Sequence, residues 1–218
     1  MASSSAIPVR SSPIRLRHVT FAVLLPLFLF VLWHDERFII IHSDEKWAYY
    51  FPVRWLVLPH VLGGLIALLI GPFQFSSRFR QQHLSVHRIM DRVYLSAVAV
   101  SAIMALYVSS IHQQLQDRLW VFSLAATWLI TGGMAFAAVR NGNIEAHRQW
   151  MARNYAFTSV FITARVLNAV PIPDSFGMAT GWMLLLATLL FAEIGLSWQS
   201  ILTNRRSQRP TTATNRAR

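Results

Sequence analysis

Six long apolar runs constrain this chain more than any other feature of its sequence. Each run has about 17 to 25 residues, the length that an α-helix needs to cross the hydrocarbon of a bilayer. The runs cover roughly residues 17–33, 53–75, 89–111, 119–139, 153–170 and 178–202. Glycine, proline and charged residues mark the gaps between them. The pattern predicts an all-α polytopic membrane protein, with six transmembrane helices in one bundle that comprises residues 17–202.

The composition agrees with this class. Hydrophobic residues make up 54% of the chain and charged residues only 13%, a balance that soluble domains do not need. There is no cysteine, which excludes disulfides, thiolate nucleophiles and iron–sulfur clusters. The first run has a basic front and an apolar body, as a signal peptide has. Because no small-residue cleavage site follows it, we interpret it as an uncleaved first span.

Arginine is distributed unevenly, and its distribution predicts the topology. Both tails and the gaps after the second and fourth runs are rich in arginine, whereas the other gaps hold few basic residues among acidic ones. By the positive-inside rule, the arginine-rich side faces the cytoplasm. We therefore expect both termini on the cytoplasmic side. The asymmetry explains the net charge of +11 without nucleic acid, and the lipid bilayer is the expected partner.

Two tails flank the predicted domain. Residues 1–16 form a cytoplasmic N-terminal tail. Residues 203–218 form a basic tail that we expect to be disordered and able to touch anionic lipid.

Polar residues recur on one face of the fifth run. If the helix is continuous from His147, the members of this face lie within about 60° of His147 on the helical wheel. They are His147, Met151, Asn154, Thr158, Arg165 and Asn168. Because ionisable groups are costly in lipid, the face is expected to line the bundle interior or a wet cavity. A structural seam of hydrogen bonds between helices is the alternative.

The second run carries a histidine among small residues. His60, Gly64, Ala67 and Gly71 share one helical face, where a neighbouring helix or a flat cofactor can approach the backbone. Helix packing is the commoner reason for such a face. By depth, His60 and Arg165 are expected to share a pocket on the outer side.

Histidines also cluster near the predicted cytoplasmic face. His87 and Asp91 are spaced so that the carboxylate can accept a hydrogen bond from the imidazole. His87 and His147 both lie at helix starts on this side, and paired histidines on facing helices hold b-type haem. His60 and His112 form a second possible pair toward the outer face. Glu193 is expected to be a buried ionisable group in the sixth helix.

Three motifs carry a family resemblance. They are HVLGGLIALLIGPFQF at 60–75, HRIMDRVY at 87–94 and HRQWMARNYA at 147–156. In this order the chain resembles a bacterial family of multi-span membrane proteins known only as a domain of unknown function, from His60 to Arg165. With the predicted topology, the resemblance implies a location in the bacterial inner (cytoplasmic) membrane. The resemblance implies these shared positions: His60, Gln74, His87, Arg92, Tyr94, His147, Trp150, Met151, Arg153 and Arg165.

One position departs from the family pattern. Asp91 stands where the family has glycine, which argues against a haem plane packed closely at this point. The layout is also similar to that of transmembrane di-haem cytochromes b, an analogy of fold alone.

The leading functional hypothesis is haem b binding with electron transfer in the membrane. His87 and His147 would ligate the haem iron, and His60 belongs to a second, less favoured site. Arg92, Arg153 and Arg165 would neutralise propionates or bind an anionic or quinone-like substrate. A redox protein is the implied partner.

Two alternatives stay open. In one, the histidines, Arg165 and Glu193 line a pathway for a proton or small solute. In the other, the protein is a non-catalytic membrane subunit whose polar seams only join helices. The absence of G-x-S-x-G and H-E-x-x-H motifs argues against a hydrolase, and the sequence leaves open whether the protein is an enzyme.

Overall fold

The computed structural model describes residues 16–169 and 177–207, which contain helices and no strand. The elements are α1 (Leu16–His34), α2 (Glu45–Tyr50), α3 (Arg54–Gln74), α4 (Ser77–Gln82), α5 (Leu84–Ile111), α6 (Leu115–Arg140), α7 (Ile144–Asn168) and α8 (Gly177–Ser207). Short 3₁₀ helices, Arg37–Ile39 and Phe51–Val53, flank α2. The predicted all-α class is confirmed.

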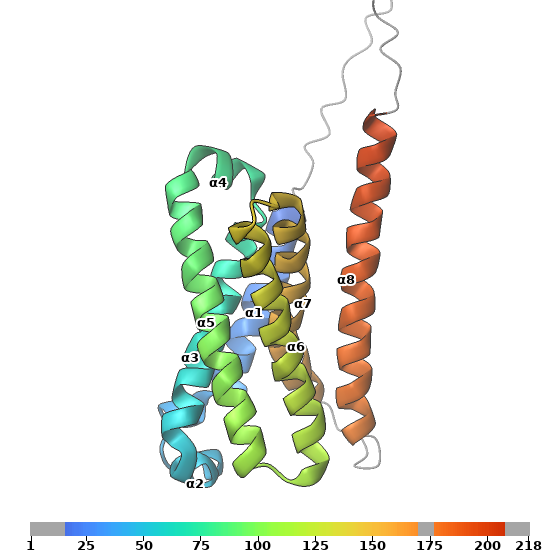
Figure 1. Cartoon of the computed structure of the whole chain (residues 1–218). Coiled ribbons are helices and arrows are strands. Elements are labelled where there is room, and N and C mark those ends of the chain that lie inside the picture. Colours follow the sequence, from blue (N-terminus) through green and yellow to red (C-terminus); the bar gives the residue numbers. More distant parts are fainter. Residues whose placement is uncertain (1–15, 170–176, 208–218) are drawn as a thin grey trace, which may run out of the picture.

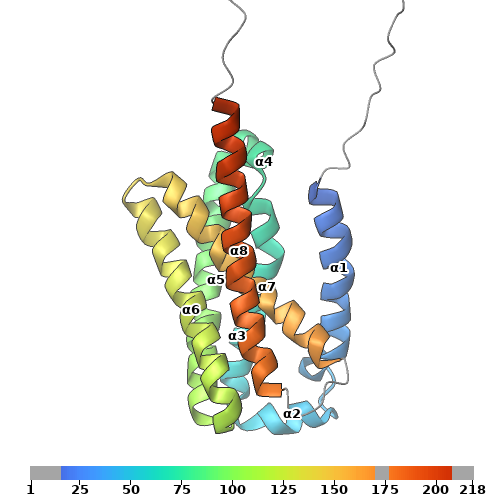
Figure 2. The same ribbon diagram turned by 90° about the vertical axis from the view of Figure 1, so that its right-hand side faces the viewer.

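Most of the long helices run up and down along one axis, α7 crosses them obliquely, and α2 and α4 lie at opposite ends (Figures 1 and 2). We refer to these as the α2 end and the α4 end. The helices α5 and α7 start at the α4 end, whereas α3, α6 and α8 start at the α2 end (Figures 1 and 2). The α4 end is the one that the arginine distribution assigns to the cytoplasm, and this orientation stays a prediction.

Among the described residues, four helical segments are long and apolar enough to cross a membrane. They are Glu45–Gln74, Leu84–Ile111, Asp117–Arg140 and Ala179–Trp198. In α1, Leu25–His34 forms a shorter apolar segment, and α7 is not among the four. Large apolar side chains are exposed along α3, α5 and α8, where lipid would cover them. Membrane-spanning helices are therefore supported, and the count of six spans stays a prediction.

Several helix boundaries differ from the sequence prediction. The third and fifth apolar runs were expected to begin at residues 89 and 153, but α5 begins at Leu84 and α7 at Ile144. Their first turns are polar, so hydrophobicity alone misses them. The Asn143 side chain accepts a hydrogen bond from the Ala146 N–H at 3.0 Å and caps α7. The helix is thus continuous from His147 to Arg165, as the polar face required.

The predicted tails overlap the ends of helices. α8 continues to Ser207, so residues 203–207 are helical, contrary to the expected disorder. Residues 1–15, 170–176 and 208–218 lie outside the described part of the chain, and with them most of both predicted tails and of the gap PIPDSFG.

Small residues bring α3 and α5 into close contact. A Cβ atom placed on Gly63 would lie 2.7 Å from the Ala97 carbonyl oxygen and 2.9 Å from Ser101 Cβ. Gly64, Ala67 and Gly71 are buried on the same side of α3, and Gly71 packs against the ring of Tyr155 in α7. Neighbouring helices therefore fill the small-residue face that was expected to admit either a helix or a flat cofactor.

Candidate functional site

The polar face of α7 meets three separate groups of side chains between the two ends of the bundle. His147, Met151, Asn154 and Thr158 are all buried, as the sequence predicts. The side chain of Asn168 lies outside the described residues. We name the three groups by position: the α4-end cluster is His87, Asp91 and His147; the central knot is Tyr94, Trp128, Thr131, Asn154 and Thr158; the α2-end group is Glu36, His60 and Arg165.

In the α4-end cluster, a backbone hydrogen bond orients His147. Its Nδ1 donates to the Ala135 carbonyl oxygen of α6 at 2.9 Å. Its Nε2 lies 3.6 Å from Asp91 Oδ1 on α5. The His147 residue is only 8% exposed, so this contact between imidazole and carboxylate lies inside the bundle.

Two atoms of this cluster are buried without a hydrogen bond to any described residue. They are His87 Nδ1 and Asp91 Oδ1. The expected hydrogen bond between His87 and Asp91 is not formed, because the carboxylate points across the bundle toward His147. Buried polar atoms are nearly always satisfied, and orphaned ones indicate a water molecule, a proton or a ligand.

The central knot joins α5, α6 and α7 by hydrogen bonds. The Tyr94 hydroxyl donates to Asn154 Oδ1 at 2.7 Å and lies 2.9 Å from Thr158 Oγ1. Trp128 Nε1 donates to Thr158 Oγ1 at 2.9 Å. The Asn154 amide donates to the Trp128 carbonyl at 2.7 Å and to Thr131 Oγ1 at 2.9 Å. The residues of the knot are buried and mutually satisfied, which is the seam of hydrogen bonds considered as an alternative.

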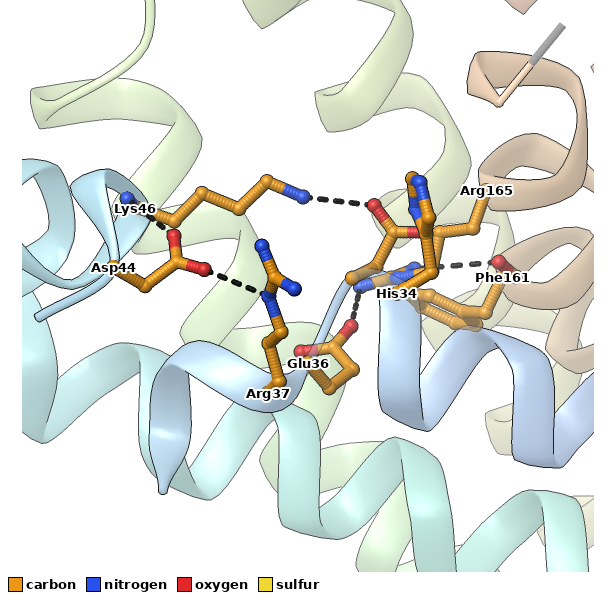
Figure 3. A network of polar contacts seen from close by, with 8 residues as sticks. His34, Glu36, Arg37, Asp44, Lys46, Phe161 and Arg165 are labelled. Atoms are coloured by element: carbon orange, nitrogen blue, oxygen red, sulfur yellow. Dashed lines mark hydrogen bonds and ion pairs between the residues drawn. The ribbon is translucent and has the colours of Figure 1, made fainter. Parts of the chain in front are cut away.

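At the α2 end, Arg165 forms an ion pair with Glu36 that joins α7 to the segment after α1 (Figure 3). Arg165 Nη2 lies 2.5 Å from Glu36 Oε1, and Arg165 Nη1 donates to the Phe161 carbonyl at 3.3 Å. The Glu36 side chain is only 8% exposed, and Glu36 Oε2 is buried with no hydrogen bond within the described chain.

His60 belongs to the same group. A cavity of about 40 Å³ is lined by Glu36, His60 and Arg165 together with apolar side chains. The expected pocket shared by His60 and Arg165 is therefore present. His60 Nδ1 lies 2.9 Å from the Ser101 carbonyl and 3.0 Å from Ser101 Oγ, so this nitrogen is already satisfied.

Two exposed ion pairs extend from the α2-end group (Figure 3). Arg37 contacts Asp44 at 3.0 Å, and Lys46 contacts Asp35 at 2.8 Å. The Lys46 backbone N–H donates to Asp44, and this hydrogen bond, followed by the Arg37 guanidinium, holds the pKa of the Asp44 carboxyl below its usual value. Exposed pairs of this kind contribute little to stability.

Arg153 and Glu193 tie α8 to α7. Arg153 donates from Nε and Nη2 to the two Glu193 carboxylate oxygens at 2.5 and 3.0 Å, and its guanidinium lies 4.9 Å from the Trp150 ring. The Glu193 side chain is 50% exposed, so the expectation of a buried acid is wrong. The ion pair joins α8 to α7, the helix on which α8 mainly packs, and lies at the outside of the bundle.

The structure separates other residues that the sequence placed together. Ser101, the partner of His60, lies eleven residues before His112 on α5, or about 16 Å along the helix axis. His112 instead contacts Tyr49 O at 3.0 Å. The possible second haem pair, His60 with His112, is therefore not brought together. Arg165 lies about 27 Å along α7 from His147, so it cannot serve a ligand held at His147.

Residues 57–196 match the family described as predicted membrane protein (DUF2306). The chain belongs to this family. No curated protein and no solved structure matches the chain. The DUF2306 match spans α3 to α7 and most of α8, and it begins after α1 and Glu36.

Within the DUF2306 match, the shared motif positions lie in all parts of the bundle. Tyr94 and Met151 are core residues, and His147 faces Asp91. Gln74 is buried, and its side-chain amide has no hydrogen bond to any described residue. No three His, Asp or Glu side chains among the described residues converge closely enough to hold a bare metal ion.

Proposed function

We propose that the protein moves protons through the membrane along the polar face of α7, with the α4-end cluster as the loading site. The observation that supports this most concerns Asp91 Oδ1. This buried oxygen lies 3.6 Å from Nε2 of the oriented His147 imidazole and has no hydrogen bond to any described residue. Ionisable groups inside membrane proteins commonly mark proton relays.

The chemistry of the cluster suits this role. Asp91 can hold a proton at Oδ1, and a water molecule between the two side chains would pass it to His147 Nε2, 3.6 Å away. The hydrogen bond to Ala135 leaves that nitrogen free of a proton in the neutral imidazole. His87, one helical turn before Asp91 on α5, offers a second acceptor, because its Nδ1 has no hydrogen bond to any described residue. Histidine exchanges protons readily near neutral pH.

The rest of the route would follow α7. The central knot offers hydroxyl and amide groups, and the α2-end group offers Glu36 and His60 beside a small cavity. Met151 and Phe161 lie between these groups, so proton transfer across the two gaps requires water to enter there.

The proposal predicts that Asp91→Asn abolishes most proton flux. The amide keeps the shape of the side chain but cannot release a proton at neutral pH. The purified protein would be reconstituted into vesicles that contain a pH-sensitive dye, and acidification would be followed after an applied pH gradient and potential.

Glu145→Gln is the matched control, since Glu145 is an exposed acid at the same end whose partners are Arg148 and Gln149. It should retain the flux of the original protein. If the original protein is no faster than empty vesicles, or if Asp91→Asn conducts equally well, the proposal fails. Loss of folded protein without any change in flux per molecule would favour the non-catalytic subunit instead.

Haem b binding is the second candidate, and one contact favours it. Histidines that ligate iron through Nε2 usually donate Nδ1–H to a carbonyl, as His147 does to Ala135. The Asp91 carboxylate opposes it, since it faces the nitrogen that the iron would need. The groove beside Asp91 is lined by neither His87 nor His147. The residues therefore fit a haem poorly unless Asp91 moves away.

The haem hypothesis predicts a Soret band that sharpens when dithionite reduces the purified protein. The band should be lost in His87→Ala and His147→Ala. A quinone or a redox protein would then be the partner to seek. A colourless protein from cells supplied with haem would exclude the hypothesis without affecting the proton proposal.

A further inference from the structure

A groove of about 870 Å³ lies between α5 and α6 toward the α4 end. In Figure 2, α6 leans away from α5 toward its C-terminal end. Volumes of this size are typical of sites for small amphiphilic ligands. The polar relay proposed above uses Asp91 at one edge of the groove and leaves the rest of it unexplained.

Three arginines line the groove. Arg88 and Arg92 come from α5, and Arg140 comes from the last turn of α6. All three are exposed, and none of them forms an ion pair with a carboxylate in residues 16–169 and 177–207. Among the described residues, Asp91 is the one acidic residue that lines the groove, and it points to His147. Three guanidinium groups and one carboxylate therefore leave the rim with an excess of positive charge.

Below this rim the groove is apolar. Its walls are formed by Leu95, Val98, Leu129, Phe136 and Val139. Gly132 and Gly133 lie on the α6 side, and a Cβ atom added to Gly133 would meet nothing within 4 Å. Phe136 is exposed, so the apolar part opens toward the outside of the bundle, where acyl chains lie.

We propose that this groove binds an anionic phospholipid of the surrounding membrane. The phosphate group would lie among Arg88, Arg92 and Arg140, and an acyl chain would fill the apolar part beside Gly133. Guanidinium groups bind phosphate by charge-assisted hydrogen bonds, and basic pockets between transmembrane helices select anionic headgroups. A free anion would use the rim and leave the apolar part without an occupant. The binding does not require a proton on Asp91, so it stands independently of the proposed proton pathway.

The experiment uses the full-length protein in detergent with equal amounts of phosphatidylglycerol and phosphatidylcholine, and native mass spectrometry to count the lipids retained. We expect preferential retention of phosphatidylglycerol. The triple variant Arg88→Gln/Arg92→Gln/Arg140→Gln should reduce this retention roughly tenfold, because each arginine contributes attraction for the anionic headgroup.

The matched control is Arg78→Gln/Arg80→Gln/Arg148→Gln, which removes the same charge from the same end outside the groove. It should retain phosphatidylglycerol as the original protein does. If both triple variants lose phosphatidylglycerol retention equally, the lipid is attracted by the positive surface in general, and the proposal is overturned. Displacement of the lipid by millimolar inorganic phosphate would indicate a free-anion site and would also overturn it.

A second variant tests the apolar part without changing charge. Gly133→Leu should fill the acyl-chain space and lower phosphatidylglycerol retention, with an unchanged thermal unfolding temperature, because the added Cβ meets open space. Retention equal to that of the original protein would contradict the position proposed for the chain. Asp91→Asn should keep its lipid, which separates this proposal from the loss of proton flux.

Discussion

Replacing Arg165 by methionine should lower the free energy of unfolding by about 3–5 kcal/mol, the usual result of breaking a buried ion pair from one side. Arg165 is the ion-pair partner of Glu36, whose side chain is only 8% exposed. Without the guanidinium, the Glu36 carboxylate stays buried with one oxygen already unpartnered among the described residues and no positive charge beside it. The measurement is reversible unfolding in mixed micelles.

The double variant Glu36→Gln/Arg165→Met provides the decisive comparison. Because no charge then remains to be buried, much of the lost stability should return, and the two substitutions should be strongly non-additive. Equal destabilisation in the single and double variants would contradict a role for charge burial. Arg37→Met is the control, since its pair with Asp44 is half exposed on the arginine side and should matter by about 0–1 kcal/mol.

Replacing Tyr94 by phenylalanine should lower the free energy of unfolding by about 1–3 kcal/mol, because the buried Asn154 carbonyl oxygen loses the hydroxyl that donates to it. The change removes only the hydroxyl that donates to Asn154 Oδ1 and lies beside Thr158 Oγ1. Tyr94 is fully buried, so water cannot replace the lost hydrogen bond at Asn154. The same unfolding assay applies.

Tyr107→Phe is the matched control for this prediction. Tyr107 lies on the same helix and is 57% exposed, so the identical chemical change should alter stability by less than about 0.5 kcal/mol. If the two variants unfold alike, the central knot does not contribute to stability as described. If Tyr94→Phe also changes proton flux per folded molecule, the knot takes part in the proposed pathway.

Much of the fold could be predicted from local pattern. An apolar run of sufficient length specifies a helix in lipid, so α3, α5, α6 and α8 were located before any tertiary contact was known. The predicted first residues of helices are less accurate where the first turns are polar, as in α5 and α7. The polar face of α7 was also readable, since helical periodicity alone places His147, Asn154 and Arg165 together.

The partners of these residues could not be predicted in the same way. Glu36 follows α1 in a short charged segment, a context that predicts an exposed acid, yet it forms the ion pair with Arg165. The signal that points to it is the arginine itself, which requires a nearby carboxylate when it is buried. Glu193 was expected to be buried, and only the position of α8 at the edge of the bundle shows that it is half exposed.

The sequence by itself determined the class of protein, the helices and the face of α7 that turns inward, because apolar length and the 3.6-residue repeat are local properties of the chain. Only the tertiary structure decided which polar groups meet. The rotation of each helix and its neighbours depend on packing, and packing turned Asp91 to His147 instead of His87, separated His60 from His112 and opened the groove between α5 and α6.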